Sequence, residues 1–194
     1  MVVRDSPASK WRTRHSCYRS RWRTRGCSIT FTRVDERFVE TTVRREDGAV
    51  LATRSPGGTD RLPHDLIHYV VEGELGLDDG LWGRIASGVT YENFRVLEQP
   101  KRKQRPRRPR SKTKRKGLLE AEVLVWILHD IWDGTAEREW GTIRAFLDSK
   151  WSPRTRSRAD ELDERTIARV REALDRTETK WKRVPFGGEL RVDW

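Results

Sequence analysis

Residues 28–54 of this chain read SITFTRVDERFVETTVRREDGAVLATR, a stretch rich in β-branched and aromatic residues. Such residues favour strands because they pack well on a pleated, half-buried surface. Asp47-Gly48 lies between two strand-like runs, and this pair is typical of a two-residue type I′ hairpin turn, whose backbone needs positive φ. The stretch therefore predicts a meander of two or three antiparallel strands, which ends at the Pro/Gly-rich residues 55–58.

A helix is expected soon after this break, in the sequence LPHDLIHYVVEGELG that begins at Leu62. Pro63 suits the first helical turn because its missing N–H needs no partner there, and Asp65 complements the helix dipole. Apolar residues then recur at helical spacing until Gly76, which is expected to stop the helix. We predict a helix over residues 63–75 and a shorter one over residues 79–86.

The C-terminal half shows three more helical patterns, which cover residues 118–132, the region around 140–147, and residues 159–181. The last residues alternate between polar and apolar, as in a strand: Glu189, Leu190, Arg191, Val192, Asp193 and Trp194. This strand could return to the meander and join the two halves. The predicted fold class is α+β, with an N-terminal antiparallel β-meander and a C-terminal strand packed by about four helices.

Positive charge is concentrated in two segments of this 194-residue chain, whose net charge is +11. Residues 1–27 contain eight Lys/Arg and one acidic residue, and residues 101–116 contain eleven Lys/Arg and none. Such composition cannot bury enough apolar area to become ordered. We therefore predict a disordered basic leader over 1–27 and a disordered basic linker over 100–117, with 28–99 and 118–194 forming one domain.

Both basic segments are candidates for binding nucleic acid or another polyanion, because cations neutralise phosphates and interleaved Trp residues offer stacking faces. Binding of this kind would be largely independent of base sequence. The candidate contacts are Arg12, Arg14, Arg23, Arg25, Lys101, Arg102, Lys103, Arg105, Arg107, Arg108, Arg110, Lys112, Lys114, Arg115 and Lys116.

The chain has two cysteines, Cys17 and Cys27, and these offer no disulfide framework. A reducing compartment is therefore expected. No apolar run approaches the roughly 20 residues that a membrane span needs. The sequence thus predicts a soluble, cytoplasmic protein without a membrane partner.

Two histidines one helical turn apart, His64 and His68, form the clearest chemical signal in the sequence. Residues four apart share a helix face, so both imidazoles can bind one metal ion such as zinc. Glu72 is a candidate third ligand, although it lies about 12 Å along the helix from His64. Asp65 is the candidate catalytic group. Ligands from elsewhere in the chain remain alternatives to Glu72, namely Asp78, Asp79, His129 and Asp130.

A structural role explains the same residues more simply. His68 and Glu72 can form an ordinary ion pair along the helix, and His64 can satisfy a neighbouring carbonyl. The leading interpretation is therefore a small intracellular protein in which this helix is chiefly structural. A zinc-type hydrolase or lyase using His64 and His68 is the first alternative, and a nonspecific nucleic-acid-binding protein is the second.

The motif His64-Asp65-x-x-His68 resembles the zinc motif of the coenzyme Q biosynthesis family, which continues with a downstream glutamate. This chain has Gly80 at that position, with Asp79 one residue earlier, so the resemblance implies an incomplete zinc set. A closer resemblance is to a family of small uncharacterised bacterial proteins, which share a segment like residues 62–77 followed by Gly-Leu-Trp-Gly at 80–83. It covers roughly residues 28–90 and implies a domain without assigned catalytic residues.

Overall fold

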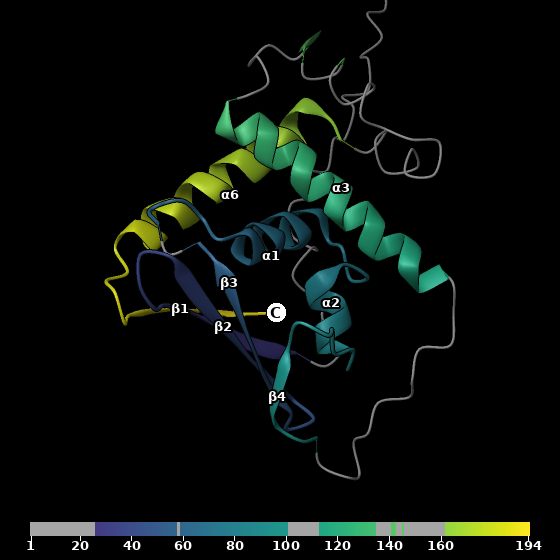
Figure 1. Ribbon diagram of the computed structural model, residues 1–194. Helices are drawn as coiled ribbons and strands as arrows, with labels where there is room; N and C mark the ends of the chain where they lie inside the picture. Colours follow the sequence, from purple (N-terminus) through teal and green to yellow (C-terminus); the bar gives the residue numbers. More distant parts are fainter. Residues whose placement is uncertain (1–25, 58, 101–112, 135–140, 143–144, 146–161) are drawn as a thin grey trace, which may run out of the picture.

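The structure is a computed structural model that describes residues 26–57, 59–100, 113–134, 141, 142, 145 and 162–194. The described residues form one antiparallel sheet with helices on one of its faces (Figure 1). In chain order the elements are β1 (Cys27–Arg33), β2 (Phe38–Arg45), β3 (Val50–Pro56), α1 (His64–Leu75), α2 (Leu81–Ala86), β4 (Arg95–Glu98), α3 (Thr113–Asp133), α6 (Glu164–Lys182) and β5 (Glu189–Asp193). The predicted α+β class is confirmed.

The five strands lie in the order β4-β3-β2-β1-β5, and every neighbouring pair is antiparallel. The turn between β2 and β3 contains Gly48 at φ 84°, so the predicted positive φ is present. The loop has three residues, 46–48, because Arg45 donates its backbone N–H to Ala49, and the predicted two-residue turn is therefore wrong by one residue. At the other side of the meander, β5 pairs with β1, so that Ile29 lies opposite Val192. The C-terminal strand therefore joins the two halves of the chain, as expected.

The two faces of the sheet differ because successive side chains of a strand point to opposite sides. On the face toward the helices, Ile29, Phe31 and Val43 are fully buried. On the other face, Ser28 and Arg44 are exposed. The hydrophobic core thus lies between one face of the sheet and the helix layer.

Helix α1 lies next to the sheet and also packs against α3 and α6 (Figure 1). It begins directly after Pro63 and ends at Gly76, which adopts the left-handed conformation at φ 65°. Both boundaries follow the predicted signals. Leu66 and Val71 are among its fully buried apolar residues. Packing on several sides fixes the orientation of its remaining, polar face.

The structure corrects both predicted boundaries of the basic segments. The leader was predicted to reach residue 27, but Cys27 is buried in β1 and exchanges two backbone hydrogen bonds with Trp194. The linker was predicted to reach residue 117, but α3 already begins at Thr113. Lys and Arg have high helix propensity, so their charge does not prevent a helix at these residues. Residues 1–25 and 101–112 lie outside the described part of the chain.

One strand of the structure was not predicted, and one predicted helix lies mostly outside the described residues. Strand β4 was not predicted, because all four of its residues are exposed and show no alternation of buried and exposed positions. It pairs with β3 at the edge of the sheet. The predicted helix around residues 140–147 lies mostly outside the described residues. Within the described part, no helix is both long and apolar enough to cross a membrane.

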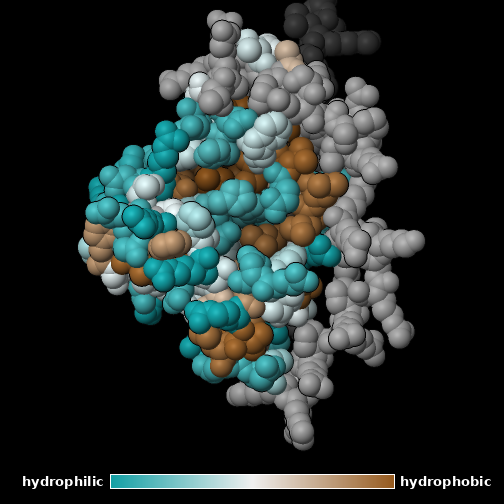
Figure 2. Space-filling view, in the orientation of Figure 1, coloured by the Kyte–Doolittle hydropathy of each residue, from teal (hydrophilic) through white to brown (hydrophobic). Residues whose placement is uncertain are grey.

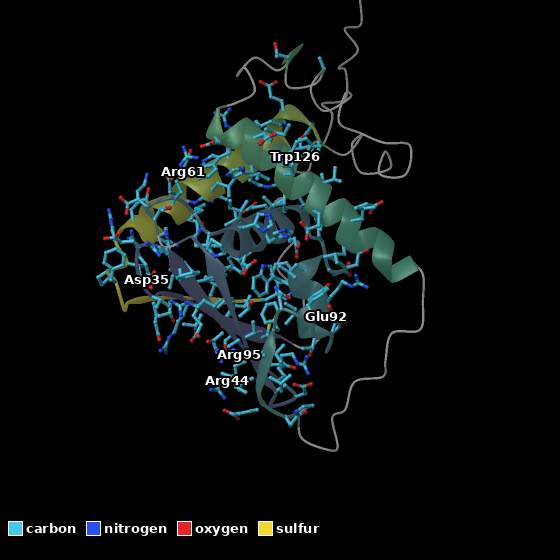
Figure 3. All side chains as sticks on the ribbon, in the orientation of Figure 1. Asp35, Arg44, Arg61, Glu92, Arg95 and Trp126 are labelled. Atoms are coloured by element: carbon cyan, nitrogen blue, oxygen red, sulfur yellow. The ribbon has the colours of Figure 1, made fainter. Side chains whose placement is uncertain are left out.

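On the face shown in Figure 2, the described surface is mostly hydrophilic, with hydrophobic patches along α3 and near β4. Charges of both signs are mixed on it (Figure 3). Three labelled arginines each face a carboxylate: Arg44 lies 3.8 Å from Glu98, Arg95 lies 3.5 Å from Glu40, and Arg61 lies 3.2 Å from Asp133. Exposed pairs of this kind contribute little to stability. They do place a negative charge next to each of these three arginines.

Candidate metal centre

Helices α1 and α3 bring together two histidines and a carboxylate, which we call the His/His/Glu cluster: His64, His68 and Glu122. Each residue offers one ligand atom, and these atoms all lie within 4.8 Å of one another. The two imidazole rings are 4.7 Å apart between centroids. The Nε2 atom of His68 lies 3.3 Å from an oxygen of Glu122. The donor set of two imidazoles and one carboxylate is typical of zinc and related divalent ions.

The cluster lies at the rim of the contact between α1 and α3. His68 is fully buried, whereas His64 and Glu122 are exposed. Helix α3 is held against α1 by apolar residues on its inner side, among them Leu124 and Leu128. Glu122 lies just beside that apolar side. One ligand therefore comes from the interior and two from the surface, an arrangement that leaves the solvent side of the cluster open.

The other ring nitrogen of His68 is held by Glu72. The Nδ1 atom lies 2.9 Å from Oε1 of this carboxylate, which is also fully buried. Glu72 accepts two backbone hydrogen bonds at the start of α2, from Leu81 at 2.8 Å and from Trp82 at 3.0 Å. These contacts fix the carboxylate, which in turn orients the imidazole. In the neutral tautomer that donates from Nδ1, the lone pair of Nε2 points toward the other two members of the cluster.

The buried Nε2 atom of His68 has no hydrogen bond among the described residues. Glu122 is near it, but the geometry is not that of a hydrogen bond. An unsatisfied buried polar atom costs about 1–3 kcal/mol, so such atoms are rare in native structures. A metal ion bound at Nε2 would satisfy this atom and would also use His64 and Glu122. The residues present therefore fit a metal site.

The electrostatics of the cluster favour a positive charge at its centre. Partial desolvation of the His64 ring, whose residue is otherwise exposed, together with the neighbouring His68, lowers the pKa of His64 and so favours the neutral form that can bind a metal. Burial also acts to lower the pKa of His68, but the carboxylates of Glu122 and Glu72 outweigh it and raise this pKa to about 9. The His68 ring holds the pKa of Glu122 below its usual range. Either a proton or a metal ion at Nε2 can supply the charge that the two carboxylates stabilise.

Asp65 lies beside the cluster but is not one of its three ligands. Burial raises the pKa of its carboxyl group, although the nearby His64 and His68 act to lower it. Its backbone oxygen accepts a hydrogen bond from the Trp82 indole at 3.1 Å. A carboxyl group whose pKa is raised beside a metal site can take up and release protons, which is the role expected of Asp65.

No family model, curated protein or solved structure matches this chain.

The structure corrects the predicted third ligand. Glu72 lies at Nδ1 of His68, whereas His64 and Glu122 gather at Nε2, so Glu72 supports the cluster from behind instead of completing it. The alternative Asp79 packs against Gly117 of α3, where a side chain at residue 117 would overlap its carboxylate. The third member of the cluster is instead Glu122, which the sequence analysis did not single out.

Glu122 was missed because no spacing rule connects α3 with the His-bearing helix. It is one acidic residue in an otherwise amphipathic pattern, where a solvated position is the ordinary expectation. The alternative that came closest was His129, which lies near enough to lower the pKa of His64 but outside the cluster. His129 and Glu122 both belong to α3, but only the packing of α3 against α1 shows that Glu122 is the residue that reaches the histidines.

Gly80 has a specific role in holding Glu72. A Cβ atom at this position would lie only 2.5 Å from the carboxylate carbon of Glu72. Glycine therefore allows the carboxylate to reach the first N–H groups of α2. This is the position at which the coenzyme Q family pattern has a glutamate, and here it supplies space instead of a ligand.

We expect Gly80→Ala to displace Glu72 and to reduce the free energy of unfolding by about 1–3 kcal/mol, as overpacking of a filled interior typically does. Urea denaturation measures this change. Gly73→Ala in α1 is the matched control, because the nearest atom to its new Cβ would be 3.9 Å away. Equal stability changes for the two variants would contradict this role of Gly80.

Proposed function

We propose that the protein binds one zinc-type divalent ion through His64, His68 and Glu122 and acts as a metal-dependent hydrolase. Two histidines and one glutamate form the protein ligands of known catalytic zinc sites, which keep a fourth position open for water. The single observation that carries the proposal is the buried Nε2 atom of His68, which has no hydrogen bond within the described part of the chain while its opposite nitrogen is held by Glu72.

Each residue has a distinct role in this proposal. His64, His68 and Glu122 hold the ion at the open rim between α1 and α3, and Glu72 orients the His68 ring and increases its basicity. A bound zinc ion supplies a water molecule whose pKa is lowered to about 7, which makes a nucleophile at neutral pH. Asp65 is the proton carrier, because burial raises the pKa of its carboxyl group.

The competing structural explanation is that His68 is an imidazolium ion between two carboxylates. It accounts for the contact of 2.9 Å with Glu72. It does not explain why a second imidazole, whose pKa is lowered, lies 4.7 Å from the first between ring centroids. The ligand atoms of the two imidazoles and the carboxylate lie within 4.8 Å of one another. This arrangement favours a metal ion, because the ion uses all three donors.

Isothermal titration of the metal-free, untagged protein with zinc tests the proposal. We expect one site per chain, and we expect His68→Ala and Glu122→Gln to weaken binding by more than the roughly 10–100-fold typical of an outer-shell partner. His129→Ala and Glu172→Gln are the matched controls, since both residues lie outside the cluster. Absence of binding, or equal losses in the controls, would contradict the proposal.

The eleven Lys/Arg of residues 101–116 support a second proposal, nonspecific binding of nucleic acid. Because such binding releases counterions, its affinity should fall by orders of magnitude between about 50 and 200 mM salt. Fluorescence anisotropy with DNA oligonucleotides of two unrelated sequences measures both the salt slope and the sequence preference. Binding that does not change with salt would reject this mode.

A cytoplasmic location stays a prediction, tested by fractionation of cells.

A further inference from the structure

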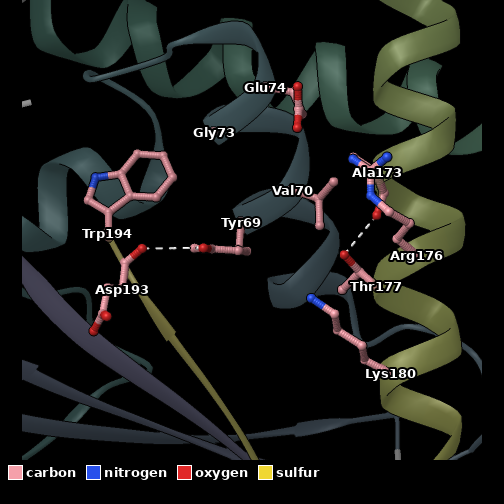
Figure 4. A pocket seen from close by; sticks show the side chains of 10 residues that line it. All are labelled: Tyr69, Val70, Gly73, Glu74, Ala173, Arg176, Thr177, Lys180, Asp193 and Trp194. Atoms are coloured by element: carbon pink, nitrogen blue, oxygen red, sulfur yellow. Dashed lines mark hydrogen bonds between the residues drawn. The ribbon is translucent and has the colours of Figure 1, made fainter. Parts of the chain in front are cut away.

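A second site lies on the other side of α1, where α1, α6 and the end of β5 line an open pocket of about 460 Å³ (Figure 4). Pockets that bind small molecules typically measure about 300–1,000 Å³. Tyr69 and Gly73 line this cavity from α1. They lie on a different face of the helix from His64 and His68, because successive helical residues are turned by about 100°. The cavity is therefore separate from the His/His/Glu cluster.

One side of the cavity suits a flat apolar group. The rings of Tyr69 and Trp194 meet edge to face, with centroids 6.1 Å apart and planes at 65°. The absence of a side chain at Gly73 and the short side chain of Ala173 keep the space between α1 and α6 open. A Cβ atom at Gly73 would lie 3.9 Å from the Trp194 ring, so the helix backbone itself borders the aromatic wall. Aromatic walls of this kind pack well against planar ligands.

The opposite side presents a positive charge. Figure 4 shows the Lys180 ammonium extending from α6 toward α1, while the carboxylate of Asp193 points away from α6. Within the described residues, Lys180 is in no ion pair. The other acidic residue of the lining, Glu74, is already held by Arg169, which donates to its carboxylate at 3.0 Å and to its backbone oxygen at 2.9 Å. The other cation of the lining, Arg176, is paired with Glu172 at 2.6 Å. The cation that remains available to a ligand is therefore Lys180.

We propose that this pocket binds a small molecule that joins an aryl body to an anionic group, either a carboxylate or a phosphate. The aryl body packs against Tyr69 and Trp194, and the anion pairs with Lys180. A ligand with both parts gains from both walls, whereas a ligand with one part gains from only one of them.

Titration of the isotope-labelled full chain with phenyl phosphate and with benzoate, followed by NMR, tests this proposal. We expect saturable shifts at Gly73 and Thr177, and binding at least about tenfold tighter than that of inorganic phosphate or benzyl alcohol. A preference between phenyl phosphate and benzoate identifies the anionic group. Probe binding should be equally strong after metal removal with a chelator, which separates this site from anion binding at a metal. Absence of saturation, or shifts only around His64, would overturn the proposal.

Two variants test the two walls. Gly73→Leu fills the cavity from α1 with a good helix former and should abolish probe binding. Lys180→Gln should weaken binding by about fivefold or more. Lys182→Gln is the matched control, because it removes the same charge from the same helix at a residue that pairs with Glu178 at 2.8 Å. Equal effects of Lys180→Gln and Lys182→Gln would contradict the assigned role of Lys180.

Discussion

Glu72→Ala is expected to reduce the free energy of unfolding by about 3–5 kcal/mol, which is the usual cost of removing one partner of a buried pair. The lost carboxylate is fully buried and serves three donors: the backbone N–H groups of Leu81 and Trp82 and Nδ1 of His68. All three would lose their acceptor, and the donors of Trp82 and His68 are buried. Guanidinium denaturation, with the melting temperature as a second readout, measures the loss.

Glu72→Gln provides the matched comparison, because the amide keeps the shape and one acceptor oxygen. We expect a smaller loss of stability, about 1–3 kcal/mol, since only part of the hydrogen bonding is lost. Zinc affinity should still fall by about 10–100-fold, because the amide no longer increases the basicity of His68. A stability loss below about 1 kcal/mol for Glu72→Ala would show that the carboxylate does not hold α1 and α2 together.

Trp82→Ala is expected to have a similarly large effect, about 3–5 kcal/mol, because it removes a large, fully buried side chain from the core. The Trp82 ring meets Phe31 of β1 edge to face, with centroids 6.0 Å apart, and its indole donates to the backbone of Asp65. The side chain thus connects α2 to the sheet and to α1. Urea denaturation measures the change.

Trp126→Ala is the control for this prediction, since Trp126 on α3 is 47% exposed (Figure 3). We expect a change below about 1 kcal/mol for that variant, as for most surface substitutions. Trp82→Phe should lie between the two, because it keeps the ring contact with Phe31 and loses the indole donor. A loss for Trp82→Ala as small as that for Trp126→Ala would contradict the central position of Trp82 in the core.

Local patterns predicted the elements whose signals are themselves local. The β-branched and aromatic residues of 28–54 mark strands, Asp47-Gly48 marks their turn, and Pro63 and Gly76 mark the ends of α1. Each signal acts within a few residues of the backbone that it shapes. Strand β4 was missed because an exposed edge strand needs no buried face, and its place is decided by the β3 edge that it pairs with.

The candidate site divides in the same way. Helical geometry alone puts His64 and His68 on one face, so this pair could be recognised from its spacing. The role of Glu72 depends on the turn that brings the N–H groups of α2 onto its carboxylate, and Gly80 leaves room for that approach. The third member, Glu122, reaches the pair only because α3 packs against α1. Spacing along the chain is a local property, whereas the convergence of ligands from two helices is produced by burial of their apolar faces against each other, which only the tertiary structure decides.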